Sequence, residues 1–276
     1  MPLVSFLAFL LIILVIFDYL PKPQSRQTTQ SQEAKSSGFG EKETQAKKDF
    51  TKLTDSYNQV LSDTQAEFGI TYLDLETGEK ASINGEKVFH AASTTKPIVA
   101  VYALKQVDEG KLSLEQKIGE LPLSERIRLL VNISDNDSWE QLLKFFGISK
   151  IQNFSQSLGL LNTNHFKNTT TSGDLANFLV KIHRQPILSS KNKEFLLSLM
   201  QKTETEGRIP AGIANWKLVY HKAGSFNGEV HDIAIVNHPK NPFILAILSD
   251  GVNDLTGRPK ILAQIARISW EFANKQ

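Results

Sequence analysis

The chain has 276 residues, of which 41% are hydrophobic and 22% charged, a balance typical of a globular protein with a full core. Its 31 basic and 29 acidic residues give a formal net charge of +2, so no basic excess attracts a phosphate backbone, and nucleic acid is not an expected partner. The absence of cysteine excludes disulfides, thiolate nucleophiles and Cys-ligated zinc.

The first 20 residues predict a membrane anchor. Residues 3–17 are almost continuously apolar, and the run reaches about 18 residues if it is extended to Leu20, which is marginally long enough for a membrane-spanning helix. A cleaved signal peptide is the second interpretation, but a basic stretch before the run and a small-x-small cleavage site are both missing. A buried core helix is the third, and the lack of an amphipathic face disfavours it.

Residues 21–47 are rich in Pro, Gln, Ser, Thr, Glu and Lys, with one isolated Phe39, and cannot bury enough apolar surface to fold. They are predicted to form a flexible polar linker that tethers a folded domain, residues 48–276, to the membrane. Lys22 and Arg26 follow the apolar run, and the positive-inside rule alone would keep this side in the cytoplasm. That orientation conflicts with the extracytoplasmic substrates inferred below, and the sequence leaves the conflict open.

Within the predicted domain, hydrophobic spacing indicates strands at both ends and helices between them. A helix in which Phe50, Leu53 and Tyr57 recur at helical spacing precedes two predicted strands. The predicted strands cover 68–75, 81–86, 216–223, 230–237 and 243–250. The later predicted helices cover 93–109, 124–131, 136–146, 150–158, 172–183, 191–202 and 257–274. The sequence therefore predicts an α+β (α/β) fold, in which one antiparallel sheet of about five strands, built from both ends of the domain and flanked by helices, joins a mostly helical middle subdomain.

Ser93 and Lys96 lie three residues apart at the start of a predicted helix, so their side chains share one face. A serine hydroxyl is a weak nucleophile and needs a base within hydrogen-bonding reach. A lysine amine becomes that base when burial and the positive end of the helix dipole lower its pKa. By itself this spacing is common, and an N-capping serine beside a surface lysine explains it equally well.

Two further motifs change this interpretation. Ser134-Asp135-Asn136 precedes another predicted helix, and Lys222-Ala-Gly-Ser lies at the end of a predicted strand. In this order the three motifs resemble the signature of the class A β-lactamases and penicillin-binding D,D-peptidases. Flanking blocks such as Arg208-Ile-Pro-Ala-Gly extend the resemblance over roughly residues 65–272. It implies a β-lactamase-like fold and an active-site serine hydrolase that forms an acyl-enzyme.

The resemblance implies a role for each of five side chains. Ser93 attacks the substrate carbonyl and Lys96 takes its proton. Ser134 relays a proton to the leaving nitrogen, Asn136 holds Lys96 and the substrate amide, and Lys222 supplies positive charge beside Ser134.

The resemblance also implies an oxyanion hole and a carboxylate site. The backbone N–H groups of Ser93 and Ser225 would stabilise the oxyanion. Arg208, Ser225 and Gly224 would bind the substrate carboxylate, because Arg208 stands where some relatives place an arginine for it. A surface salt bridge is the alternative role for Arg208.

Two departures from the family pattern bear on the reaction. Ala223 stands where the family usually has Thr or Ser, so one hydroxyl donor is missing. The stretch that normally carries the deacylating glutamate is shortened, and no Glu or Asp occurs between Ser149 and Thr171. His165 is the only basic titratable candidate there apart from lysines. The acyl-enzyme is therefore expected to deacylate slowly.

The function predicted first is acylation by β-lactams, with possible hydrolysis and a role in antibiotic resistance. A D,D-carboxypeptidase or transpeptidase acting on peptidoglycan stem peptides is the alternative, and a non-catalytic cell-wall binding module is the second alternative. No cofactor or metal is expected, since His221, His231 and His238 lack a metal-ligand arrangement. The protein is expected to be a monomer, anchored with its catalytic domain outside the cytoplasm, or secreted if the N-terminal segment is cleaved.

Overall fold

The computed structural model describes residues 49–251 and 255–275. The predicted anchor, residues 1–20, and the predicted linker, residues 21–47, lie outside them. Within the described residues, no helix combines the length and the apolar character needed to cross a bilayer.

A five-stranded antiparallel sheet organises the domain, in the order β2-β1-β9-β8-β7. Its strands are β1 (Glu67–Asp74), β2 (Lys80–Ile83), β7 (Val219–Phe226), β8 (Glu229–Val236) and β9 (Phe243–Asp250). Strand β9 pairs with β1 along all eight residues of β1, so the two ends of the domain meet in the middle of the sheet. Both halves of the sequence therefore complete one sheet, which confirms the predicted fold class.

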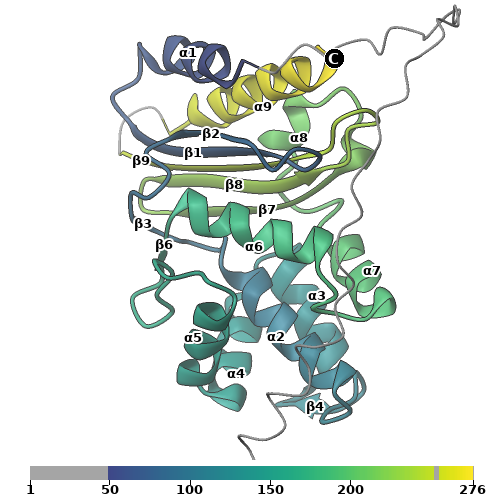
Figure 1. Cartoon of the computed structure of the whole chain (residues 1–276). Coiled ribbons are helices and arrows are strands. Elements are labelled where there is room, and N and C mark those ends of the chain that lie inside the picture. The colour runs from purple at the N-terminus through teal and green to yellow at the C-terminus, as the bar shows by residue number, and fades with distance from the viewer. Residues whose placement is uncertain (1–48, 252–254, 276) are drawn as a thin grey trace, which may run out of the picture. The chain divides into compact units, whose positions relative to one another are not determined.

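Helices cover both faces of this sheet (Figure 1). On one face lie α1 (Phe50–Leu61), the short α8 (Ile209–Gly212) and the C-terminal α9 (Arg258–Asn274). They enclose an apolar core that includes Tyr57 and Tyr72. On the other face, α6 (Ser172–Arg184) lies against the sheet, and its buried residues join the core of the helical region.

The helical region lies between β2 and β7 in sequence. Its other helices are α2 (Lys96–Asp108), α3 (Leu123–Asn132), α4 (Asn136–Phe146), α5 (Ile148–Ser157) and α7 (Ser190–Leu199). Helix α2 is surrounded by this region, and Ile98 to Val101 are all fully buried. An all-round apolar helix of this kind is stabilised by burial on every side. It supplies a rigid support for the residues at its N-terminus.

Several local boundaries differ from the prediction; β2 ends at Ile83 rather than at residue 86, and α7 ends at Leu199 rather than at residue 202. Helix α2 begins at Lys96 rather than Ser93, because Ala92 adopts a left-handed backbone (φ 48°) and residues 92–95 form turns. The predicted strand 216–223 is a 3₁₀ turn over 216–218, followed by β7, so Lys222 lies inside the strand. Four short strands were not predicted: β3 (Phe89–His90), β4 (Lys117–Ile118), β5 (Leu121–Pro122) and β6 (Thr169–Thr170).

Candidate active site

Ser93 lies in a turn that is held from two sides. Asn168 binds the turn through two side-chain hydrogen bonds. Its side-chain nitrogen donates to Ala92 O at 3.0 Å, and its Oδ1 accepts from Thr95 Oγ1 at 3.1 Å. The Asn168 carbonyl also accepts from the Ala91 N–H at 2.7 Å. This connection fixes the backbone on both sides of Ser93 and leaves its hydroxyl facing the cavity described below.

Lys96 is almost fully buried, with 2% of its surface exposed. Its Nζ donates to the Ser134 carbonyl at 2.5 Å and to Asn136 Oδ1 at 2.7 Å. Burial lowers the pKa of Lys96 to about 8, although the nearby Asp135 carboxylate opposes this shift. The lowered pKa increases the neutral fraction of Lys96 near neutral pH, and the neutral amine is the form that a general base requires.

The start of α4 places Asn136 against Lys96. Asp135 caps this helix, because its carboxylate accepts from the Ser138 N–H at 2.6 Å. Ser134, just before the cap, has a left-handed backbone (φ 61°), an uncommon conformation for a residue with a side chain. The sequence Ser-Asp-Asn thus combines a strained turn, a cap and a first helical residue in three consecutive positions.

Lys222 approaches Ser134 from strand β7. Its Nζ donates a hydrogen bond to Ser134 Oγ and another, of 3.0 Å, to the Ala223 carbonyl. Burial, reinforced by the positive charge of Lys96, lowers the pKa of Lys222 to about 7. Two buried amines with lowered pKa values therefore contact Ser134: Lys96 at its backbone carbonyl and Lys222 at its hydroxyl.

Gly224 brings β7 against the nucleophile turn. A Cβ added at Gly224 would lie only 2.9 Å from the Ser93 backbone nitrogen and 3.2 Å from Thr94 Cγ2. Only a residue without a side chain permits this close approach of the two backbones. Ser93 and the following Ser225 therefore lie on facing segments, where the resemblance places their N–H groups.

Arg208 is buried, with 7% of its surface exposed, so the alternative of a surface salt bridge is wrong. Its guanidinium donates to Gly224 O at 2.7 Å, to His231 O at 2.5 Å and to Ser225 Oγ at 2.5 Å. All three acceptors are uncharged oxygens. Arg208 thus reaches Ser225 at the edge of the cavity. None of these three contacts neutralises the charge of the guanidinium.

These elements enclose a cavity of about 460 Å³, within the size range of small-molecule sites. It is lined by His90, Ala92, Ser93, Lys96, Ser134, Asn136, Trp139, Glu140, Asn168, Ser225 and Phe226. The predicted nucleophile, base, proton relay and amide side chain therefore share one cavity. Among the described residues, no hydrogen bond joins Ser93 Oγ to Lys96, and such catalytic contacts often tighten only with substrate bound.

Six lining residues were not predicted as site residues: His90, Ala92, Trp139, Glu140, Asn168 and Phe226. The ring of Trp139 lies 5.8 Å from Lys96 Nζ. Glu140 follows Asn136 by four residues on α4, and this spacing is the sequence signal that places both on one helix face. Asn168 and Phe226 carried no such signal, because loop and sheet packing bring them to the cavity.

His165 does not belong to this cavity lining. It is 3% exposed, and its Nε2 lies 2.8 Å from Ser155 Oγ. Burial lowers its pKa to about 4. The one basic candidate that the sequence offered for deacylation is therefore a buried side chain that packs against α5. In the described part of the chain, no three His, Asp or Glu side chains gather in a way that would hold a metal.

A profile of the β-lactamase enzyme family matches residues 52–273. The chain belongs to this family. β-Lactamase VEB-1 of Pseudomonas aeruginosa is 23% identical over 274 residues, covering 80% of this chain and 90% of VEB-1. β-Lactamase ROB-1 of Haemophilus influenzae is 27% identical over 221 residues, covering 67% of this chain and 72% of ROB-1.

Solved structures of the β-lactamase family share the fold. PBP-A superposes with a TM-score of 0.75 at 26% identity, covering 82% of this chain and 97% of PBP-A. The TLA-1 extended-spectrum β-lactamase gives a TM-score of 0.75 at 25% identity, covering 81% and 98% of the two chains. The family and the fold are those of serine hydrolases of the class A β-lactamase and penicillin-binding type.

Proposed function

We propose that this protein forms a covalent acyl-enzyme at Ser93 with β-lactams and releases it slowly. The observation that carries the proposal is the arrangement of two buried lysines around Ser134, beside Ser93 in one cavity. Each lysine has a pKa lowered by burial, to about 8 for Lys96 and about 7 for Lys222. Burying an amine costs stability, so two buried amines beside a serine indicate a functional role. Proton transfer is a role that their lowered pKa values suit.

The proposed acylation moves one proton in two steps. Neutral Lys96 accepts the proton of the Ser93 hydroxyl as Ser93 Oγ bonds to the β-lactam carbonyl carbon. As the C–N bond of the ring breaks, the Ser134 hydroxyl gives its proton to the leaving nitrogen, and the proton that Lys96 took from Ser93 replaces it, which returns Lys96 to its neutral form. The charge of Lys222 stabilises the electron-rich Ser134 oxygen during this transfer.

The remaining site residues bind the substrate. The N–H groups of Ser93 and Ser225 stabilise the oxyanion, and Gly224 allows the two segments to approach closely enough for one oxygen. Arg208 and the Ser225 hydroxyl bind the substrate carboxylate at the edge of the cavity. A PBP-A mutant determined as an acyl-enzyme complex with penicillin-G supports this proposal, as it is 27% identical and superposes with a TM-score of 0.74.

Slow deacylation follows from what lines the cavity. Residues 150–170 contain no Asp or Glu, and the buried His165 lies elsewhere. Among the described residues, the one carboxylate in the lining is the exposed Glu140 of α4. A water molecule attacking the acyl-enzyme thus lacks a carboxylate from the loop that would ordinarily supply one.

Intact-mass spectrometry of the full chain with benzylpenicillin tests this proposal. An adduct of the mass of the drug is expected on the wild type within seconds to minutes and to persist for hours, and Ser93→Ala is expected to form none. Glu140→Gln is expected to leave the lifetime of the adduct unchanged. Loss of the adduct within seconds, together with hydrolysed drug, would show an efficient β-lactamase, and a longer lifetime in Glu140→Gln would identify its base.

A D,D-peptidase is the second candidate, because an acyl-enzyme without a loop carboxylate also suits transfer to an amine. Release of D-alanine from a stem peptide ending in D-Ala-D-Ala, lost in Ser93→Ala, would support this activity. If neither the drug nor the peptide acylates Ser93, the non-catalytic binding module becomes the better proposal. The intact set of site residues argues against that module, since binding alone needs no pair of buried amines.

We also propose that the domain works outside the cytoplasm, held by residues 1–20, since peptidoglycan peptides and β-lactams are encountered there. Protease treatment of intact spheroplasts is expected to digest the domain, and the intact mass is expected to include the first 20 residues. Protection from protease would place the domain in the cytoplasm, as the positions of Lys22 and Arg26 suggest.

The acylation rate is expected to follow a bell-shaped pH profile with its maximum between about pH 7 and 8. Below the pKa of Lys96, about 8, the base becomes protonated and the rate falls. Above the pKa of Lys222, about 7, the positive charge beside Ser134 is lost and the rate falls again. Stopped-flow acylation from about pH 6 to 9 measures both limbs. Lys222→Arg, which stays charged, is expected to abolish the alkaline limb, and a wild-type rate independent of pH would contradict these roles.

A further inference from the structure

A buried group of charged side chains lies on the face of β7 opposite Lys222. His221, 1% exposed, has its Nδ1 3.0 Å from one Asp232 carboxylate oxygen and 3.1 Å from the other. Its Nε2 lies 3.2 Å from Glu206 Oε1 and 3.0 Å from Thr203 Oγ1. Successive strand residues point to opposite faces, so none of these groups enters the active-site cavity. The proposed acylation leaves this cluster without a role.

His221 is held as a charged group. Burial by itself would lower the pKa of His221, but Asp232 from β8 and Glu206 from the preceding loop outweigh it and raise the pKa to about 9. With both carboxylates engaged, protonated His221 bridges strand β8 to the loop before α8. A buried, satisfied bridge of this kind fixes geometry more than it adds stability.

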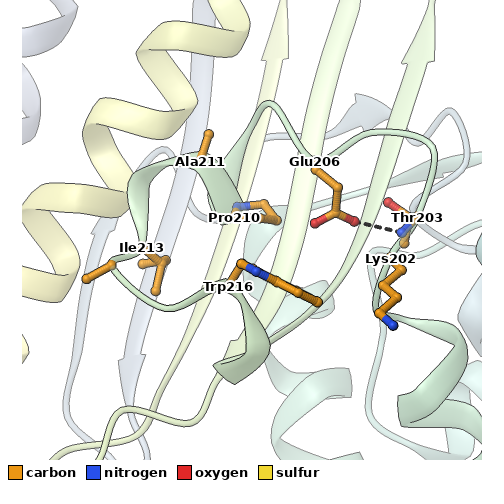
Figure 2. A pocket seen from close by; sticks show the side chains of 8 residues that line it. Lys202, Thr203, Glu206, Pro210, Ala211, Ile213 and Trp216 are labelled. Atoms are coloured by element: carbon orange, nitrogen blue, oxygen red, sulfur yellow. Dashed lines mark hydrogen bonds between the residues drawn. The ribbon is translucent and has the colours of Figure 1, made fainter.

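The cluster is attached directly to the segment that carries Arg208. Asp232 Oδ2 accepts from the Ile209 N–H at 3.1 Å, so the residue after Arg208 is bound to the same carboxylate as His221. On the other side, Glu206 Oε1 accepts from the Thr203 N–H at 2.6 Å, a contact that Figure 2 shows. The 203–209 segment is thus fixed at both ends by partners of one imidazolium.

The segment borders a cavity of about 600 Å³ lined by Glu206, Pro210, Ile213 and Trp216, among others, and Figure 2 shows these side chains. The outer side of the segment therefore has little packed against it. The Glu206 side chain is 40% exposed there. The contacts with His221 and Asp232 therefore supply the restraint that packing does not.

We propose that His221 is a positioning residue that holds the segment carrying Arg208 where the guanidinium meets the substrate carboxylate. The inference rests on the proposed function, because it requires a carboxylate-bearing substrate in the active-site cavity. It concerns recognition of the substrate carboxylate, since Asn168 holds the Ser93 turn, Lys96 begins α2, and Ser134 lies just before the Asp135 cap of α4. Loss of the bridge loosens Arg208 and spares the nucleophile.

A comparison of benzylpenicillin with its methyl ester separates recognition of the carboxylate from chemistry at Ser93. In the wild-type full chain, benzylpenicillin is expected to acylate Ser93 faster than the ester, which offers Arg208 no anion. In His221→Gln, the acylation rate constant for benzylpenicillin is expected to fall about tenfold, while that for the ester stays within about twofold. Intact-mass time courses measure both rates.

Two further variants keep the test decisive. Glu206→Gln changes a partly exposed side chain that a folded protein tolerates, and it is expected to reduce the same carboxylate preference by a smaller factor. His238→Gln removes another buried histidine, which bonds Asn274 far from this cluster, and it is expected to leave both rates unchanged.

Each outcome has one meaning. Equal losses for the acid and the ester in both His221→Gln and Glu206→Gln would overturn the inference, because the cluster would then support the fold alone. An unchanged preference in both variants would also overturn it. A wild type that forms no adduct with either compound would refute the proposed function itself, and the inference with it.

Discussion

Replacing Lys96 with methionine is expected to lower the rate of Ser93 acylation by benzylpenicillin by about 10²- to 10⁴-fold, the range that a positioned general base contributes. Methionine fills a similar volume in the space that Lys96 occupies, where only 2% of the surface is exposed. It also removes the amine that donates to Ser134 O and Asn136 Oδ1, so the base is lost while the packing of α2 is kept.

The measurement is the second-order rate constant for adduct formation, followed by intact mass at several drug concentrations. Lys105→Met on the same helix is the matched control, because Lys105 forms an exposed pair with Glu109 and lies outside the cavity. Its rate is expected to equal that of the wild type. An acylation rate in Lys96→Met within tenfold of the wild type would show that another group takes the proton from Ser93.

The sheet was predictable because hydrophobic patterns specify its strands locally. Seven of the eight residues of β1 are buried, as are seven of β9, and such apolar runs indicate a strand covered on both faces. Strands were predicted at both ends of the domain and helices between them, and this order predicted that the two ends form one sheet. The pairing order was not predictable, since register depends on which strands meet in space.

The boundaries that were missed depend on tertiary contacts. The predicted helix at Ser93 included three turn residues, because apolar spacing alone does not show the left-handed Ala92 or the grip of Asn168 on this turn. The two-residue strands β3 and β6 pair with each other, and Thr169 of β6 also bridges to Asn164. Segments so short carry no periodicity.

In the candidate site, too, residues in sequence motifs were predictable, and residues brought together by tertiary contacts were not. Ser93, Lys96, Ser134 and Asn136 were predicted because their motifs, followed by Lys222-Ala-Gly-Ser, resemble the family signature in this order; spacing alone does not single them out. Glu140 was not predicted, because the resemblance places the deacylating carboxylate in the shortened loop and Glu140 lies on α4. Helical spacing does place it beside Asn136. The His221 cluster spans β7, β8 and the loop before α8, and no local pattern joins its members.

Gly224→Ala is expected to lower the acylation rate by about 10²- to 10³-fold, the cost of disrupting an oxyanion hole. A methyl group at this position would lie 2.9 Å from the Ser93 backbone nitrogen and 3.1 Å from the Ala92 side chain. Backbone atoms cannot rotate away as a flexible side chain can, so β7 or the nucleophile turn must shift. The shift separates the N–H groups of Ser93 and Ser225, which one oxyanion must contact together.

Acylation kinetics and thermal unfolding of Gly224→Ala together distinguish this effect from unfolding. Gly110→Ala is the matched control, because Gly110 lies beyond the end of α2 that is distant from Ser93 and a Cβ there meets no atom within 4 Å, although its left-handed backbone (φ 68°) makes the variant less stable. It is expected to acylate at the wild-type rate. Because Gly224 faces the Ser93 amide, Gly224→Ala is expected to lose acylation. Its thermal unfolding is expected to remain a single cooperative transition. A Gly224→Ala protein that acylates at the wild-type rate would place the oxyanion hole elsewhere in the cavity.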